Sequence, residues 1–197
     1  GDGHLDLLIA DGGNEYSGKT PFLKPRVYLN DGSGYLSKKE DAFPDIFETQ
    51  ACLETSDFDS DGDIDVFLGG KTISWGYGQI PNSYLLVNDG KGNFEDKTPN
   101  ELKTIGMVRD AKWLDIDQDD DQDLIIAVQW GGIYCFENNK GSFTKKTLTD
   151  KKGWWNMLYP ADIDNDGDLD FIVGNLGENS RIKASETEPV RMYVNDY

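Results

Sequence analysis

Short apolar runs recur along the chain, separated by segments rich in Asp, Asn and Gly. Four of these runs directly follow an acidic segment, at residues 7–10, 66–68, 124–128 and 171–173. Apolar runs of this length are typical of buried strands and are too short for helices. We therefore expect a strand after each acidic segment.

A second apolar triplet follows each of these strands and leads into a turn. The triplets occupy residues 27–29, 85–87, 134–136 and 192–194. The turns contain Asn, Asp and Gly, which tolerate the positive φ angles that tight hairpins require. The repeated unit is thus predicted to contain a strand, a hairpin and another strand, with enough residues for roughly four short strands.

The acidic segments are copies of one nine-residue motif. Residues 57–65 read DFDSDGDID, residues 115–123 read DIDQDDDQD, and residues 162–170 read DIDNDGDLD. The opening GDGHLD at residues 1–6 matches the last part of the motif, so its first positions would precede residue 1. The complete copies begin 58 and 47 residues apart, within the range of propeller blades.

These repeats predict an all-β chain folded as a β-propeller, with calcium-binding loops between strands. Radial repetition protects strand edges that a flat array would expose. We expect about four blades, at approximately 1–50, 51–108, 109–155 and 156–197, within a single region that spans residues 1–197. Because both ends of the sequence fall inside repeats, the expectation is an arc or half of a larger ring of about six to eight blades.

Composition narrows the classes of partner. The 37 acidic residues outnumber the 19 basic ones and give a formal net charge of −18. This argues against a nucleic-acid partner, which requires clustered Lys and Arg. No apolar run approaches the roughly 20 residues of a membrane-spanning helix, so we expect no membrane span. The sequence leaves open the oligomeric state and the redox state of Cys52 and Cys135.

Carboxylates at alternate positions of the motif are the candidate metal ligands. Two unit charges about 4 Å apart repel by about 4 kcal/mol at an effective dielectric constant of 20, so such a compact loop needs a cation. Calcium accepts about six to eight oxygens in flexible geometry, whereas softer metals prefer His or Cys. The predicted ligands are the side chains at positions one, three, five and nine and the backbone carbonyl at position seven. They are Asp57, Asp59, Asp61, Asp63 and Asp65; Asp115, Asp117, Asp119, Asp121 and Asp123; Asp162, Asp164, Asp166, Asp168 and Asp170; and, in the partial loop, Asp2, His4 and Asp6.

Two alternatives share part of this pattern. An EF-hand requires a bidentate Glu at position twelve and a following helix, but position twelve is Leu68, Ile126 or Val173. Solvated acidic turns without a metal are the second alternative, which three aligned copies make less favoured. The middle loop departs from the motif because Asp120 stands where the other copies have glycine, and Asp adopts a left-handed conformation only at some cost. The sequence therefore predicts two to three Ca²⁺ ions, and a fourth if the partial loop binds.

The repeats resemble the FG-GAP/VCBS repeats of integrin α-subunit propellers and of many bacterial surface proteins. The resemblance covers essentially the whole chain, and its more specific parts are GMVRDA at residues 106–111, GWWN at 153–156 and GNLG at 174–177. The C-terminal stretch is similar to bacterial VCBS proteins related to the ASPIC/UnbV cartilage acidic protein group. The resemblance implies a β-propeller with calcium in each qualifying blade, in an extracellular, cell-surface or bacterial-envelope setting.

No residue is assigned to catalysis. The single histidine, His4, lies in a metal loop, and most paired carboxylates fall in such loops, where bound calcium would lower their pKa values. We therefore expect a non-catalytic module for adhesion or for binding a protein or glycan ligand, which the sequence does not identify. The alternative is a calcium-dependent polysaccharide-active enzyme, a lyase or hydrolase, or a non-catalytic part of one, and it rests on fold analogy alone.

One aromatic pair is a candidate for stacking against sugar rings. Trp75 and Tyr77 lie in the segment WGYG at residues 75–78, which has no strand pattern and is expected to be a loop. Aromatic residues in propellers more often fill the core between blades. A loop position favours contact with a ligand instead.

Overall fold

The computed structural model describes residues 2–76, 78–176, 181, 185 and 187–189. Its regular elements are strands, apart from one short α-helix and one turn of 3₁₀ helix. In chain order they are β1 (Leu7–Ile9), η1 (Pro21–Leu23), β2 (Arg26–Asn30), β3 (Leu36–Lys39), β4 (Thr49–Ser56), β5 (Asp65–Thr72), β6 (Tyr84–Asn88), β7 (Phe94–Asp96), α1 (Asn100–Lys103), β8 (Met107–Leu114), β9 (Asp123–Gln129), β10 (Ile133–Asn139), β11 (Ser142–Thr149), β12 (Trp155–Ala161) and β13 (Asp170–Asn175). Among the described residues, no helix is long and apolar enough to cross a membrane.

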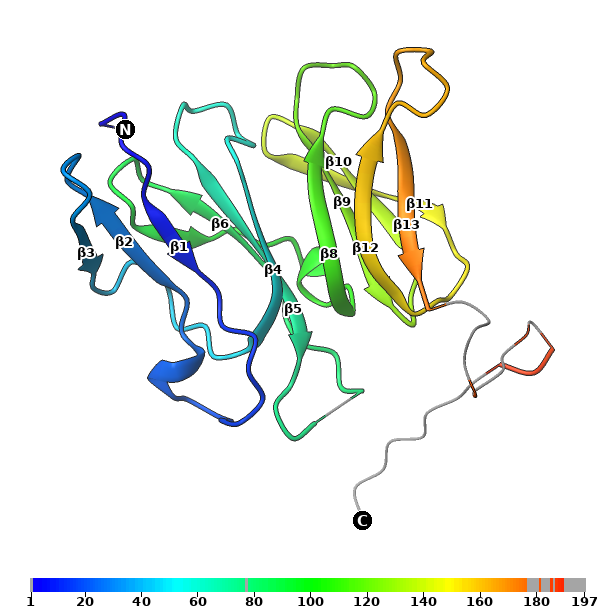
Figure 1. The fold of residues 1–197 in the computed structure, drawn as a ribbon, viewed down its shortest axis with the longest axis horizontal. Coiled ribbons are helices and arrows are strands. Elements are labelled where there is room, and N and C mark those ends of the chain that lie inside the picture. Colours follow the sequence, from blue (N-terminus) through cyan, green and yellow to red (C-terminus); the bar gives the residue numbers. More distant parts are fainter. Residues whose placement is uncertain (1, 77, 177–180, 182–184, 186, 190–197) are drawn as a thin grey trace.

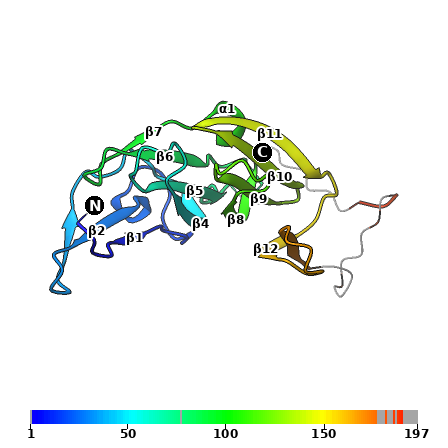
Figure 2. The ribbon, with the colours of Figure 1, turned by 90° about the horizontal axis from the view of Figure 1, so that it is seen from above.

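The strands form four sheets, in which strands that are consecutive in the chain are also neighbours. The sheets are β1-β2-β3, β4-β5-β6-β7, β8-β9-β10-β11 and β12-β13, and all pairings are antiparallel. Figure 2 shows the sheets side by side along an arc, with β1 and β2 toward one end and β12 at the other. The prediction of an all-β chain made of propeller-like blades is confirmed.

The apolar runs are continuous because the second strand of a blade is covered on both faces. In β5, Phe67 packs in a cluster with β8 and β9, while Val66 and Leu68 pack toward the first sheet. In β9, Ile125 packs with Leu158 of β12, on the side facing the last sheet. Since successive side chains of a strand point to opposite faces, a strand between two other blades can bury an unbroken run of apolar residues.

The two edges of the arc carry different kinds of loop. The three acidic loops and the N-terminal end of the chain lie along the upper edge in Figure 1, and the loops at residues 10–25 and 73–83 lie at the lower edge. The loops at residues 10–25 and 73–83 each join the first and second strands of a hairpin, and the equivalent connection in the third sheet is only residues 130–132. Long loops at one edge of a rigid scaffold are common places for binding sites.

Candidate metal centres

Each complete acidic motif forms the connection between the first two strands of a blade. Residues 57–64 join β4 to β5, residues 115–122 join β8 to β9, and residues 162–169 join β12 to β13. The antiparallel pairing of these strands brings the two ends of each loop together. The ninth position is the first residue of the following strand, so the loop passes its last carboxylate directly into the sheet.

Three carboxylate groups in each complete loop lie within 4.8 Å of one another. Positions one and three contribute in every loop. The third member is position five in the first loop and position nine in the other two. The triads are Asp57, Asp59 and Asp61; Asp115, Asp117 and Asp123; and Asp162, Asp164 and Asp170. The other predicted side-chain ligands, Asp65, Asp119 and Asp166, lie outside these triads.

Backbone N–H groups orient the first carboxylate of each loop. Asp57 accepts hydrogen bonds from the N–H groups of Asp61 and Gly62, at 3.1 and 3.0 Å. Bonds of this kind curl the loop around its own carboxylate. The equivalent bonds run from Asp119 and Asp120 to Asp115, and from Gly167 to Asp162. The three loops therefore share one backbone frame.

Positions four and six of each loop have left-handed backbone conformations. The residues at position four are Ser60, Gln118 and Asn165, each with φ of 62°. At position six, φ is 94° at Gly62, 95° at Gly167 and 72° at Asp120. The middle loop thus follows the same path as the others, although Asp120 has a Cβ where the other loops have glycine. Left-handed backbone is unfavourable for most residues with a side chain, and Asp tolerates it better than most.

The carboxylates at position seven point to other groups. Asp121 accepts a hydrogen bond from the N–H of Lys140 at 3.1 Å, and Asp168 accepts one from the side-chain amide of Gln118 at 2.7 Å. Asp63 also lies outside its triad. This arrangement leaves the backbone carbonyl as the group that position seven can offer to a cation. The contact between Gln118 and Asp168 also links the second loop to the third.

Position nine places a buried carboxylate beside the first triad. Asp65 is fully buried; its Oδ1 accepts a hydrogen bond from the N–H of Asn88 at 2.8 Å, and its Oδ2 has no well-formed hydrogen bond among the described residues, although the backbone N–H of Phe58 lies near enough to lower the pKa of the group. Burial raises the pKa of Asp65 to about 7, and the charges of Asp59 and Asp61 contribute to this shift. An unpaired buried carboxylate oxygen is unfavourable, and a cation is the partner that would satisfy it. The donor set therefore fits a hard cation.

The second loop has an equivalent buried carboxylate at position nine, and both of its oxygens accept hydrogen bonds. Asp123 is fully buried, and its two oxygens accept hydrogen bonds from the N–H groups of Asn138 and Ile116, at 2.8 and 3.0 Å. Burial is also the main cause that raises the pKa of Asp123, and the charges of Asp117 and Asp119 add to it. A bound cation would favour the ionised form of this group.

An asparagine at the end of the hairpin strand holds the metal loop in the first three repeats, although its place in the sequence indicates only a turn residue. Its backbone N–H donates to the carboxylate at position nine, and its side-chain amide donates to the carbonyl at position eight. The backbone bonds are Asn30 to Asp6 (2.9 Å), Asn88 to Asp65 (2.8 Å) and Asn138 to Asp123 (2.8 Å). The side-chain bonds are Asn30 to Leu5 (3.1 Å), Asn88 to Ile64 (3.0 Å) and Asn138 to Gln122 (3.1 Å). The signal in the sequence was an Asn at the same place in each repeat; the fourth copy, at residues 192–196, lies outside the described residues.

The partial loop at the N-terminus keeps the end of this frame. Gly3, at position six, has φ of 84°, and the N–H of His4 donates to Asp2 at 2.9 Å. Asp6, at position nine, accepts the hydrogen bond from Asn30. Within the described part of the chain, Asp2, His4 and Asp6 do not form a group of convergent metal-binding side chains.

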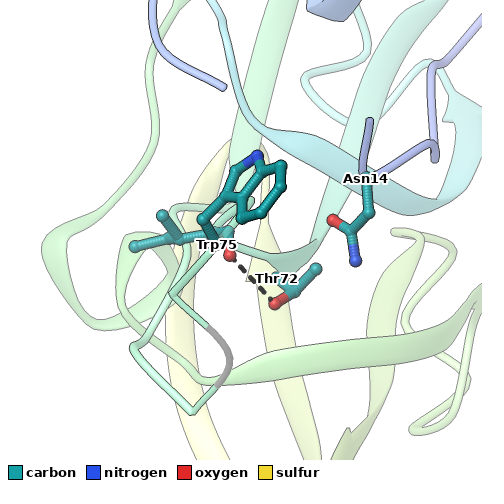
Figure 3. A pocket seen from close by; sticks show the side chains of 4 residues that line it. Asn14, Thr72 and Trp75 are labelled. Atoms are coloured by element: carbon teal, nitrogen blue, oxygen red, sulfur yellow. Dashed lines mark hydrogen bonds between the residues drawn. The ribbon is translucent and has the colours of Figure 1, made fainter. Parts of the chain in front are cut away.

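The predicted aromatic site is at the opposite edge of the arc. Trp75 is 84% exposed and has φ of 66°, a strained conformation for a bulky residue. It lines a hollow of about 350 Å³ with Asn14, Thr72 and Ile73, as Figure 3 shows for three of these residues by label. Tyr77, the other member of the predicted pair, lies outside the described residues.

Comparison with known families supports the interpretation of the chain as a series of repeats. The model of a family described as an FG-GAP-like repeat matches the chain three times, over residues 1–68, 57–126 and 115–173. Consecutive matches overlap across a metal loop, since residues 57–65 lie in the first two matches and residues 115–123 in the last two. None of the curated proteins compared with the chain matches it.

Proposed function

This chain belongs to the FG-GAP-like repeat family, and from this premise we propose that it is a calcium-binding, non-catalytic β-propeller module that binds a protein or glycan at a cell surface or in a bacterial envelope. The observation that carries the proposal is the recurrence of a carboxylate triad, built on positions one and three, in three equivalent loops at one edge of the arc. An all-oxygen donor set of this kind, with flexible geometry, suits Ca²⁺ better than Mg²⁺ or Zn²⁺.

We assign calcium a structural role. Each loop joins the two innermost strands of a blade, and side-chain bonds connect neighbouring loops. The amide of Asn138 donates to the carbonyl of Phe58 as well as to that of Gln122, so it bridges the first and second loops. A cation that neutralises the triads would stiffen the whole edge. Extracellular calcium modules bind with dissociation constants of roughly 10⁻⁴ to 10⁻³ M, which favours occupancy outside cells.

We place the ligand at the opposite edge. The exposed indole of Trp75 offers a rigid apolar plane, and Asn14 offers an amide beside it. An aromatic plane with a nearby hydrogen-bonding group is the usual way for a protein to hold a sugar ring. The edge of the arc that holds the calcium loops would then be a rigid support for the edge that binds the ligand.

Calorimetric titration of chelator-treated protein with Ca²⁺, with thermal melts in parallel, tests the calcium part. Two or three sites and a large rise in melting temperature would support it, and no binding would leave the loops as acidic turns. A glycan array and a polysaccharide depolymerisation assay test the rest. A binder retains its glycan and releases no new chain ends; release of ends would point to the calcium-dependent lyase or hydrolase instead.

A further inference from the structure

A basic cavity lies beside the first sheet of this acidic protein. It has a volume of about 390 Å³, in the range of small-ligand sites, and is formed by residues around η1, the start of β2, the end of β3 and the segment 40–47. Five of the chain's 19 Lys and Arg residues line it, against the two acidic residues Glu40 and Asp41. The basic residues are Lys19, Lys24, Arg26, Lys38 and Lys39.

Three of these cations already have carboxylate partners. The ion pairs are Lys24 with Asp45 at 2.7 Å, Arg26 with Asp11 at 3.0 Å, and Lys38 with Glu40 at 2.7 Å. Within the described part of the chain, no ion pair is made by the other two. Those two are Lys19 and Lys39.

Lys19 lies near a carboxylate that is already paired with another cation. The hydrogen bond from Lys24 is the largest cause that lowers the pKa of Asp45, and the charge of Lys19 adds to it. The charge of Asp45 is thus shared between two ammonium groups, and Lys39, which also lines the cavity, has no carboxylate partner among the described residues. The cavity keeps an excess of positive charge that an anion from outside would neutralise.

The same cations surround an aromatic ring. The ammonium groups of Lys19 and Lys24 lie 5.9 and 5.1 Å from the centre of the Phe47 ring, and Phe47 itself lines the cavity. An aromatic surface packs against the C–H faces of a sugar ring, while ammonium groups bind carboxylate or sulfate oxygens by charge-assisted hydrogen bonds. A simple inorganic anion would use only the second of these features.

We propose that this cavity binds a short acidic saccharide, with its carboxylate or sulfate group paired with Lys19 and Lys39 and a sugar ring packed against Phe47. This inference rests on the proposed glycan-binding function and names the class of glycan. It adds a site separate from the hollow at Trp75. The net charge of −18 opposes long polyanions at a distance, so a short saccharide with few charges is the ligand that fits.

The test is calorimetry of the whole chain in millimolar Ca²⁺ with four probes: trigalacturonate, a sulfated trisaccharide, neutral maltotriose and sodium sulfate. The variant is Lys19→Met with Lys39→Met. The matched control is Lys151→Met with Lys152→Met, which removes the same charge from exposed positions between β11 and β12. We expect trigalacturonate or the sulfated trisaccharide to bind and its affinity to fall at least tenfold in the first variant but not in the control.

Which acidic probe binds identifies the anionic group. Binding that is equal in the variant and the wild type, absence of binding for both acidic probes, or binding of sodium sulfate alone would overturn the inference. Calcium binding, thermal melts and neutral-glycan binding, measured on the same samples, report on the proposed function separately. If calcium and a neutral glycan bind as proposed but neither acidic probe binds, the proposed function stands and only the assignment of an acidic saccharide to this cavity is wrong.

Discussion

The backbone N–H of Asn138 donates a hydrogen bond of 2.8 Å to Oδ1 of Asp123, and so ties the end of a hairpin strand to the last carboxylate of a metal loop. The same relationship holds between Asn88 and Asp65 in the preceding blade. In both cases the loop and the hairpin at the same edge become one unit. The metal loops are therefore supported from the sheet, and their carboxylates do not depend on the cation alone for position.

Asn138→Ala should lower the free energy of unfolding by about 2–3 kcal/mol, because it removes the side-chain donor to Phe58 and Gln122 and leaves one buried and one partly buried carbonyl unpaired. In a chain of this length, that corresponds to a fall of about 4–12 °C in melting temperature. Urea unfolding in saturating Ca²⁺ measures it. Asn139→Ala is the matched control, since Asn139 is the next residue and is exposed. If the two substitutions lowered the free energy of unfolding equally, the side-chain bonds of Asn138 would not be what stabilises the metal loops.

Asp59→Ala and Asp164→Ala should each abolish one calcium site, because each removes the position-three member of a triad. The melting temperature should fall when Ca²⁺ is present and stay unchanged in chelator, since the carboxylate stabilises the loop through the ion. Asp63→Asn is the control: its side chain lies outside the triad, so the site should survive. A fall of the same size in chelator would show that the carboxylate acts without calcium.

The strands that could be predicted from the sequence are those covered by apolar side chains on both faces. β5 and β9 lie between two blades, so each contains a continuous apolar run, at residues 66–68 and 124–128, that is visible in the sequence. The first strand of each blade was not predicted. In β4, for example, Gln50 is buried although it is polar, because its backbone and side chain both pair with the backbone of Asp11 in the preceding blade. Such compensation depends on a residue far away in the sequence.

The metal loops could also be predicted from the sequence, because the pattern that defines them is local. Their carboxylate spacing lies within nine residues, so the local chain brings positions one and three together. Position five completes the triad in the first loop and position nine in the other two, although all three loops have the same carboxylate spacing, so spacing alone does not decide the third member. The basic cavity depends entirely on tertiary structure, since pairing of β2 with β3 sets Val27 opposite Lys39 and brings segments distant in sequence to one wall.

Asp120→Gly should stabilise the calcium-bound protein by about 0.5–1 kcal/mol, because glycine adopts the left-handed backbone of this position, φ of 72°, without the cost that a Cβ brings. The converse change, Gly167→Ala, should destabilise: its φ is 95°, and an added Cβ would meet no atom within 4 Å, so the cost comes from the backbone alone. Chemical unfolding of both variants measures the pair. A loss of stability in Asp120→Gly would mean that the Asp120 carboxylate contributes to the site.

Acid should destabilise the protein partly through Asp96. Burial alone would raise the pKa of Asp96, but hydrogen bonds from Thr98 and the ion pair with Lys103 at 2.9 Å outweigh it and lower the pKa. A carboxyl whose pKa is lower in the folded state contributes stability above its unfolded value of about 3.9, and that contribution is lost as the pH falls through the folded value. Asp96→Asn should therefore lose less stability than the wild type between about pH 5 and pH 2.

The measurement is urea unfolding as a function of pH in chelator, so that calcium release does not contribute. Asp150→Asn, at an exposed position, is the control and should follow the wild-type curve. If the slope for Asp96→Asn equals that of the wild type over this range, the ion pair with Lys103 contributes nothing to acid sensitivity.

Trp75→Ala should abolish binding of a neutral glycan without lowering stability. The indole is 84% exposed, so its removal sacrifices almost no buried apolar area, and its φ of 66° is a strain that the smaller residue tolerates no worse. Trp75→Phe should retain part of the binding because it keeps an aromatic plane. Ile80→Ala is the control, since Ile80 is exposed in the same loop but does not line the hollow. Strained backbone is often found at ligand sites, so ligand contact is the explanation under test for the conformation of this exposed aromatic residue. Glycan-array signals that are equal for Trp75→Ala and Ile80→Ala would move the ligand away from this loop.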